Sequence, residues 1–194
     1  MTMPFYAGLD LGQAADYSAL VIAEQTGARA PYAYDVRHIE RWPLGTSYPK
    51  IVRVVTDRMT APQLRREPLI IDGTGCGRPV VDLFRQVGSL SSHPVLITGG
   101  DTPSRDEAGY WRVPKRDLVG VVQALLQSER LRIAQGLPEA RTLTAELLNF
   151  QAKITESAHD TYGAWREGSH DDVVLGLALA LWYGEHVGNY EPGI

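Results

Sequence analysis

The sequence is poor in cysteine and in long apolar runs, and each shortage excludes a class of protein. Its 194 residues include one cysteine, Cys76, so no internal disulfide can form and a reducing cytosol is expected. The longest strongly apolar run, Val173 to Tyr183, is well short of the ~20 residues that cross a bilayer. Met1 to Pro4 lacks the basic and apolar regions of a secretory signal. These features favour a protein of the cytosol.

Positive charge is also scarce. The chain has 19 lysines plus arginines against 23 acids, a net charge of −4. No general polycationic surface is available for nucleic acid, so any DNA contact has to come from a local patch or from a metal. The P-loop motif is absent, and none of the lysines, which are Lys50, Lys115 and Lys153, follows a glycine. This excludes an ATP motor of the P-loop class from these residues.

What the sequence does contain is the material of one α/β domain, residues 1–194. Hydrophobic residues make up 44% and charged residues 22%, without repeats or a linker, so we expect a single core. Only a polar loop from Thr155 to Gly168 interrupts the pattern of strands and helices.

The expected sheet is mixed. Three antiparallel strands come first, Tyr6 to Gly12, Ser18 to Ala23 and Tyr32 to Arg41, because apolar runs are separated by turn residues. Strands then alternate with helices, and such connections need parallel pairs with right-handed crossovers. We predict five strands or slightly more, with helices on both faces. The later strands are Pro68–Asp72, Pro94–Ile97 and Leu131–Ile133, and the helices are Tyr48–Met59, a segment from about Pro79 to Gly88, Asp117–Gln127, Arg141–Lys153 and Ser169–His186.

Carboxylates stand at positions where apolar residues are expected. Asp10 lies inside the first strand, Asp72 ends a strand that reads Leu69-Ile-Ile71, and Asp171 and Asp172 open an otherwise apolar helix. Aspartate is disfavoured in strands and is rarely buried unpaired. If these acids converge, their repulsion calls for a bound cation, and hard divalent ions prefer oxygen ligands. The sequence therefore predicts a site for Mg²⁺ or Mn²⁺, with two ions about 4 Å apart for phosphodiester cleavage.

Each acid also has an ordinary structural explanation. Asp10 is suited to bond backbone amides in the following turn, and Asp72-Gly73 is a common turn pair. Asp171 and Asp172 are in a helical first turn, where the helix dipole favours negative charge. The joint occurrence of all these acids at element ends favours the metal site.

Other candidates are of second rank. Trp111 to Arg116 combines an aromatic with Arg112, Lys115 and Arg116 before a helix, and is either a DNA-backbone contact or a solvated loop. His170 precedes the acid pair and is placed either to bind the metal or to lie at the surface. Cys76 has no evident base partner in the sequence and is expected to pack as a small apolar residue.

Five stretches of sequence together carry a resemblance to a known family. On these stretches the chain resembles the nuclease domain of the large terminase subunit of tailed bacteriophages and prophages, in the ribonuclease H-like superfamily. The order of the acids, on the first strand, at the end of the fourth and at the start of the last helix, agrees with that superfamily. The stretches are Gly8–Gly12 with Asp16–Val21, Ile71–Asp82, Val113–Leu118, Leu143–Phe150 and Gly168–Ala178.

For the site, the resemblance implies that Asp10 bridges two metal ions, that Asp72 holds one of them and that Asp171 or Asp172 is the third ligand. Asp172 shares a helical stripe with Gly176, whereas Asp171 lies over the next stripe, and this leaves the choice open.

For the activity, the resemblance implies an endonuclease that cuts concatemeric double-stranded viral DNA during genome packaging, in the cytoplasm of the bacterial host. Its implied partners are double-stranded DNA, the terminase ATPase domain, the small terminase subunit and the portal. The ATPase motor of a full large subunit is missing from these residues, so we expect either an excised domain or a separately encoded nuclease.

Three alternatives remain at this stage. A junction-resolving nuclease of the same fold would act as a symmetric dimer on four-way junctions. The Gly8–Gly12 segment also suits the phosphate-binding strand of actin-like ATPases, although those need two such domains. A catalytically inactive docking module of the same fold is the third, and the presence of acids at all three positions argues against it.

Overall fold

The computed structural model describes residues 4–12, 16–74, 78–156 and 171–188, with backbone alone for residues 150–156. In these segments eight strands form one mixed sheet. The strands are β1 (Phe5–Asp10), β2 (Ser18–Thr26), β3 (Ala33–Trp42), β4 (Pro68–Asp72), β5 (Ser91–Thr98), β6 (Ser104–Arg105), β7 (Trp111–Pro114) and β8 (Leu131–Ile133). The helices are α1 (Tyr48–Met59), α2 (Arg78–Gln86), α3 (Lys115–Gln127), α4 (Ala140–Glu156) and α5 (Asp172–Tyr183), which continues into the π-helical segment η2 (Gly184–Gly188).

The sheet has the order β6-β7-β5-β4-β1-β2-β3-β8. Strands β1, β2 and β3 are antiparallel neighbours, whereas β4, β5 and β7 follow one another parallel to β1. The predicted mixed sheet, with antiparallel strands first and parallel strands later, is confirmed. Strands β6 and β7 were not predicted, and they extend the sheet beyond five strands.

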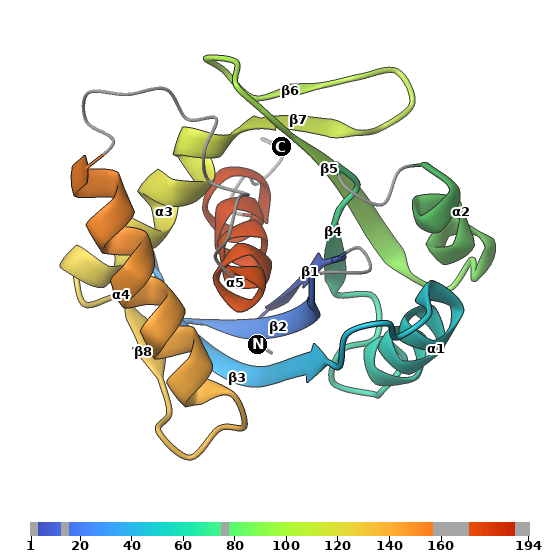
Figure 1. Ribbon diagram of the computed structural model, residues 1–194, viewed down its shortest axis with the longest axis horizontal. Helices are drawn as coiled ribbons and strands as arrows, with labels where there is room; N and C mark the ends of the chain where they lie inside the picture. Colours follow the sequence, from blue (N-terminus) through green and yellow to red (C-terminus); the bar gives the residue numbers. More distant parts are fainter. Residues whose placement is uncertain (1–3, 13–15, 75–77, 157–170, 189–194) are drawn as a thin grey trace.

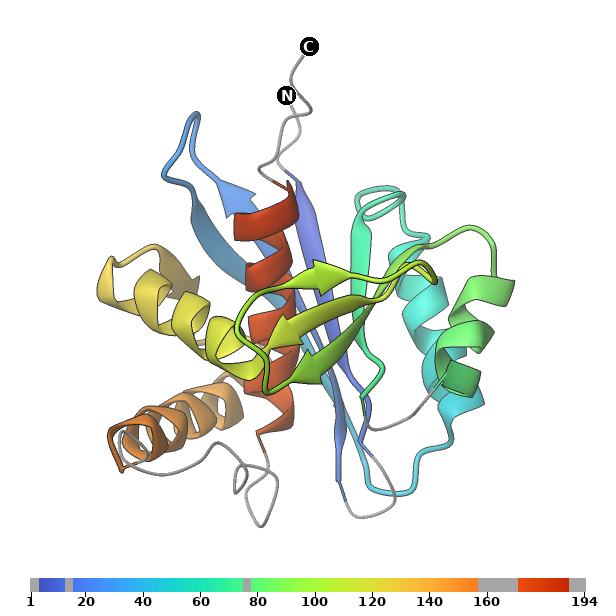
Figure 2. The same cartoon turned by 90° about the horizontal axis from the view of Figure 1, so that it is seen from above.

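Helices cover both faces of the sheet, as predicted. Figures 1 and 2 show α1 and α2 on one face and α3, α4 and α5 on the other. Each face has its own apolar core, one beneath α1 and α2 and the other around α5. All twelve residues of α5 are buried, because the helix lies between the sheet and the two helices outside it.

A pair of glycines lets α5 lie directly on β1. A Cβ atom added to Gly8 would stand 1.9 Å from the carbonyl oxygen of Gly176, so only hydrogen fits at this crossing. Further along the helix, Gly184 lies against Tyr34 and Tyr6. Since α5 passes first Gly8 and then Tyr6, it runs antiparallel to β1, and its first turn lies toward the carboxyl end of that strand.

An irregularity in β3 changes which side chains face α5. Ala23 pairs with Val36, but its neighbour Ile22 pairs with His38, so one residue of β3 is extra at this point. Such a bulge shifts the alternation of side chains by one residue. Beyond it, the odd-numbered residues Ile39 and Arg41 take the face that Val36 holds before it.

The start of the last helix differs from expectation. The sequence predicts a helix from Ser169, but α5 begins at Asp172 with Asp171 as the N-cap residue, and Ser169 lies outside the described residues. The reason is that a side chain from α4 binds the first amides of α5, so no local serine is required. Among the helices of the described segments, none combines the length and apolar character needed to span a bilayer.

Candidate functional site

Asp10 and Asp72 are adjacent across two parallel strands. Asp10 ends β1 and Asp72 ends β4. Leu9 pairs with Ile71, so one further step along both strands brings Asp10 level with Asp72. Because neighbouring strands are about 4.8 Å apart, the two carboxylates start from adjacent positions at the same edge.

Both carboxylates are on the α5 face of the sheet. Asp10 pairs with Ala19, which belongs to the core around α5, and paired residues project from the same face. Ile70 belongs to that core and Ile71 to the opposite one, so alternation directs Asp72 to the α5 face as well. The exposed fractions are 8% for Asp10 and 2% for Asp72. These are buried acids, as their apolar sequence context predicts.

Asp172 approaches the same edge from above. It lies one helical turn before Gly176, the residue that touches β1, and so shares the sheet-facing stripe of α5. Its exposed fraction is 6%, whereas Asp171 is half-buried at the N-cap. The site geometry therefore favours Asp172 of the predicted pair.

Arg41 completes this row of side chains. It pairs with Ala19, which in turn pairs with Asp10, so Arg41 lies at the same level two strands away and on the same face. One Nη of Arg41 donates to Oδ2 of Asp172 at 3.0 Å. The guanidinium also lies 3.6 Å from the ring centroid of Tyr17. The structure thus places one cation among the acids, and the sequence had not indicated it.

Glu146 of α4 is a fourth buried acid near the start of α5. Its Oε2 accepts hydrogen bonds from the amides of Val173 at 3.0 Å and Val174 at 2.9 Å. Negative charge is favourable at a helix N-terminus. The residue is 5% exposed, and Oε1 has no hydrogen-bond partner among the described residues. Glu146 therefore holds the first turn of α5, which carries Asp172.

Burial raises the pKa of Glu146 to about 7, and the negative charges of Asp172 and Asp171 add to this effect. The amide of Val174 and the charge of Arg41 act in the opposite direction. Near neutral pH this carboxyl is consequently close to half protonated. The site is electrostatically crowded, which is the property expected where cations bind.

Asp72 also shapes the loop that follows its strand. Its Oδ1 accepts a hydrogen bond from the amide of Thr74 at 2.8 Å, and the hydroxyl of Thr74 accepts one from the amide of Ile97 at 2.8 Å. Asp72 therefore does stabilise a turn, and it also belongs to the acid row, which consists of Asp10, Asp72 and Asp172. The adjoining Cys76 lies outside the described residues, as does His170.

The donor atoms fit a divalent cation, although they do not form a ready-made centre. Among the described residues, no three Asp, Glu, His or Cys side chains are grouped closely enough to hold a metal ion. Asp10, Asp72 and Asp172 nevertheless offer only carboxylate oxygens, the ligands that Mg²⁺ and Mn²⁺ prefer. Asp172 is bonded to Arg41, so this carboxylate has to be shared or released before it can bind a cation.

The predicted basic patch lies on defined elements and not in a loop. Arg112 is in β7, and Lys115 and Arg116 open α3 directly after it. Because β7 runs parallel to β5 and β4, Lys115 and Arg116 follow its carboxyl end, at the edge that carries the acids. Arg112 alternates with Trp111 and Val113, which pack with the core around α5, so it projects from the opposite face of the sheet. Arg112 and Arg116 are exposed, and each has an acidic neighbour. Arg112 is 3.9 Å from Asp106, and Arg116 is 2.8 Å from Asp101.

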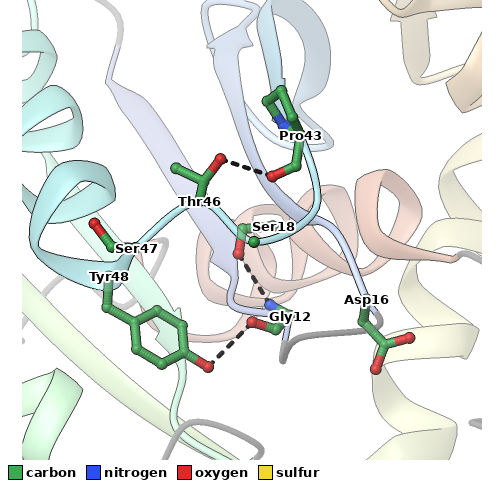
Figure 3. A pocket seen from close by; sticks show the side chains of 8 residues that line it. Gly12, Asp16, Ser18, Pro43, Thr46, Ser47 and Tyr48 are labelled. Atoms are coloured by element: carbon green, nitrogen blue, oxygen red, sulfur yellow. Dashed lines mark hydrogen bonds between the residues drawn. The ribbon is translucent and has the colours of Figure 1, made fainter.

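A pocket of about 270 Å³ lies beside the carboxyl end of β1 (Figure 3). The hydroxyl of Tyr48 donates to the carbonyl of Gly12 at 3.1 Å, and the amide of Gly12 donates to Ser18 at 3.1 Å. None of the acids predicted as metal ligands lines this pocket, so it is distinct from the acid row. Its lining residues are Gly12, Asp16, Ser18, Pro43, Gly45, Thr46, Ser47 and Tyr48.

Two residues of the site were missed from the sequence. Glu146 had a usable signal, because it falls on the helical stripe of Leu143 and Leu147 and is therefore a charged residue among core positions. Arg41 had none, since uninterrupted alternation from Tyr34 directs it to the other face. Only the bulge in β3 brings it to the acids.

Comparison with known proteins adds evidence on the fold. The large terminase nuclease from thermophilic phage G20c matches with a TM-score of 0.63 and 19% identity, over 97% of this chain and 83% of that one. The human cytomegalovirus terminase nuclease domain, soaked with Mn and bound to an inhibitor, matches with a TM-score of 0.56 and 12% identity, over 94% of this chain and 83% of that one. The HK97 bacteriophage large terminase gives 0.56 and 16%, over 94% of this chain and 40% of that one. No protein-family model and no curated protein matches the sequence.

These similarities define the fold class of the protein. A mixed sheet with three antiparallel strands, parallel strands beyond β1 and acids at the strand ends is a ribonuclease H-like fold. More particularly, the fold is that of the nuclease domains of large terminases. The resemblance seen in the sequence is confirmed at this level.

Proposed function

We propose that this protein is a divalent-cation-dependent DNA endonuclease. The observation that carries the proposal is the placement of Asp10 and Asp72 at neighbouring strand ends, with Asp172 on the sheet-facing stripe of α5, in a fold shared with terminase nucleases. Buried carboxylates on the same face of a sheet are costly to a fold unless they serve a cation.

Each acid has a separate role in this proposal. Asp10 would be the ligand shared by both ions, Asp72 would hold one of them, and Asp172, or its neighbour Asp171, would be the third ligand. His170 is a candidate to orient the phosphate. Bound Mg²⁺ or Mn²⁺ supplies an activated water and stabilises the charge of the departing 3′ oxygen. Glu146 keeps the first turn of α5 fixed, so that Asp172 stays over the row.

The DNA backbone is expected to lie along the same strand edge. Lys115 and Arg116 follow this edge in the first turn of α3, and Arg112 of β7 adds a cation on the opposite face of the sheet. Contacts from these side chains to phosphates position a duplex without reading its sequence. With a net charge of −4, such binding is weak and salt-sensitive.

In its biological setting, we propose cleavage of concatemeric double-stranded viral DNA during genome packaging, in a bacterial host. The terminase ATPase domain, the small terminase subunit and the portal are the proposed partners. Support comes from the fold shared with the terminase nucleases of phage G20c and human cytomegalovirus.

Plasmid cleavage tests the activity. Supercoiled plasmid is incubated with the purified chain in Mn²⁺, Mg²⁺ or EDTA, beside the Asp10→Asn variant. The matched control is Asp57→Asn, an exposed aspartate on α1. We expect metal-dependent nicking and linearisation that Asp10→Asn loses and Asp57→Asn retains. Equal cleavage by Asp10→Asn would reject the site, and cleavage in EDTA would reject metal dependence.

A further inference from the structure

Arg41 is placed to neutralise the acid row from inside the fold. It shares its row and face with Asp10, through Ala19, and neighbouring strands about 4.8 Å apart put Arg41 and Asp10 about 10 Å from each other. Asp172, in the first turn of α5, bonds to Arg41 at 3.0 Å. Arginine remains protonated at any physiological pH, so this positive charge is permanent.

We propose that Arg41 is a built-in counter-ion of Asp172, and that a divalent cation has to displace it from this carboxylate on binding. Arg41 is thus a positioning residue that sets the affinity of the site for cations. The inference rests on the proposed function, because it takes Asp172 as a cation ligand.

The need for a counter-ion follows from burial. Asp10, Asp72, Asp172 and Glu146 are each no more than 8% exposed. Without a cation, like charges in such surroundings repel one another and favour protonation or rearrangement. In the ion pair of Arg41 with Asp172, the side chain of Arg41 is 17% exposed and that of Asp172 is 7% exposed. The pair is therefore largely withdrawn from water and only weakly screened by salt.

The contact also has the features of one that can open. One Nη of Arg41 bonds to Oδ2 of Asp172, and Nε takes no part in the contact, whereas arginine contacts are strongest when two N–H groups are engaged as a fork. Nε of Arg41 is buried without a hydrogen-bond partner among the described residues. The ring of Tyr17 already lies 3.6 Å from the guanidinium, so the cationic group keeps this contact when Asp172 is released.

Cation binding measured without catalysis tests the proposal. Calorimetric titration with Mn²⁺, and with Ca²⁺ as a second probe, is performed on the wild type and on Arg41→Gln. The matched control is Arg37→Gln, on the same strand, where an arginine pairs with Glu24 at 2.7 Å but is half exposed. We expect at least tenfold tighter Mn²⁺ binding in Arg41→Gln and no change in Arg37→Gln, because only Arg41 competes for a ligand.

Thermal unfolding gives a second readout. In EDTA, Arg41→Gln leaves the acids without their cation and is expected to unfold at a lower temperature than Arg37→Gln. Saturating Mn²⁺ is expected to raise its Tm by more than it raises that of the wild type. If Arg41 were only a structural support for Asp172, the loss in EDTA would appear without the larger gain in Mn²⁺.

A second variant keeps the test valid if Arg41→Gln does not fold. Tyr17→Leu leaves the ion pair in place but removes the aromatic face that would retain the guanidinium after Asp172 is released, so Mn²⁺ should bind several-fold more weakly. Unchanged or weaker binding in Arg41→Gln, or unchanged binding in Tyr17→Leu, overturns the counter-ion role alone. Absence of any cation binding in the wild type overturns the metal site of the proposed function, and the present inference with it.

Discussion

The two ends of α5 are held by opposite kinds of chemistry. At its first turn, Asp172 bonds to Arg41 and the leading amides bond to Glu146. At its last turn, Trp182 packs edge-on against Trp111, with ring centroids 5.6 Å apart, and Tyr183 packs near Tyr6 at 6.2 Å. The helix between them is apolar and fully buried.

This contrast separates the part of the helix that stabilises the fold from the part that serves the site. Aromatic burial is favourable in itself, and large side chains supply most of it. Buried charges are favourable only when they are matched, and they are kept where function needs them. We therefore expect substitutions at the aromatic end to change stability, and substitutions at the charged end to change cation binding.

Trp182→Ala should break the aromatic end and have the largest effect. The side chain is 1% exposed, and such a truncation costs about 3–5 kcal/mol of unfolding free energy. Urea denaturation measures the loss. The control is Leu148→Ala, which truncates a side chain that is 64% exposed, and its unfolding free energy should stay within about 0.5 kcal/mol of the wild type. At a temperature where both are folded, Mn²⁺ affinity should match the wild type. A loss below about 1 kcal/mol would contradict the role given to this end.

Gly8→Ala should separate the helix from the strand between its two ends. The added methyl would stand 1.9 Å from a backbone oxygen, so α5 has to shift, at a cost of about 1–3 kcal/mol or more. Gly120→Ala on α3 meets no atom within 4 Å and should gain up to about 1 kcal/mol from helix propensity. Chemical denaturation of both variants measures the difference. Equal stability of the two would mean that β1 and α5 are not in close contact.

Glu146→Ala should weaken the charged end by about 1–2 kcal/mol, because two amides of α5 lose their acceptor. Glu146→Gln keeps an acceptor oxygen and should lose less. The alanine variant should also bind Mn²⁺ more weakly, since the turn that carries Asp172 is no longer held. Thermal melts and calorimetry together test this, and an alanine variant that retains wild-type affinity would restrict Glu146 to stability.

The smallest effect is expected from pH, near the aromatic end. Burial lowers the pKa of His93 to about 4, and its ring packs 4.7 Å from that of Tyr183. The unfolded chain therefore binds a proton that the folded chain excludes, and stability falls as the pH drops from about 7 to 6, by less than about 1 kcal/mol. Glu146, with its pKa raised to about 7, acts in the opposite direction over this interval.

Comparison with His93→Asn isolates the histidine contribution. Unfolding free energies of both proteins are measured at pH 7 and pH 6, and Glu146 contributes equally to each. Lowering the pH from 7 to 6 should therefore change the stability of the wild type less favourably than that of the variant, by less than about 1 kcal/mol. Parallel behaviour would place a protonated His93 in the folded state.

Local sequence patterns were sufficient for much of the fold. The predicted bounds of Tyr48–Met59, Pro68–Asp72 and Leu131–Ile133 agree with the structure, because apolar spacing and turn residues define them locally. Strands β6 and β7 were missed, since a two-residue strand and Trp111–Pro114, with its proline, have little pattern of their own. Pairing with β5 makes β7 a strand, and that pairing is a property of the assembled sheet.

The site was predictable only to the extent that its residues break local rules. Asp10 and Asp72 are acids in apolar strands, and their positions follow from the pattern. Arg41 follows the rules of an ordinary strand end and becomes part of the site through the bulge in β3. Glu146 is an intermediate case. Its place among the core positions of a helix could be read from the sequence, but the amides of α5 that it binds could not.

The crossing of Gly8 and Gly176 has a consequence for how accurately the site is built. Where side chains separate two elements, their spacing varies with the rotamers and volumes chosen. Here two backbones meet with only hydrogen between them, so the height of α5 above the sheet has almost no tolerance. Asp172 is one helical turn from this contact, so its height above the sheet is fixed by the same crossing. Substitutions that repack the apolar side chains of α3 can therefore alter stability while the spacing between Asp172 and Asp10 stays the same.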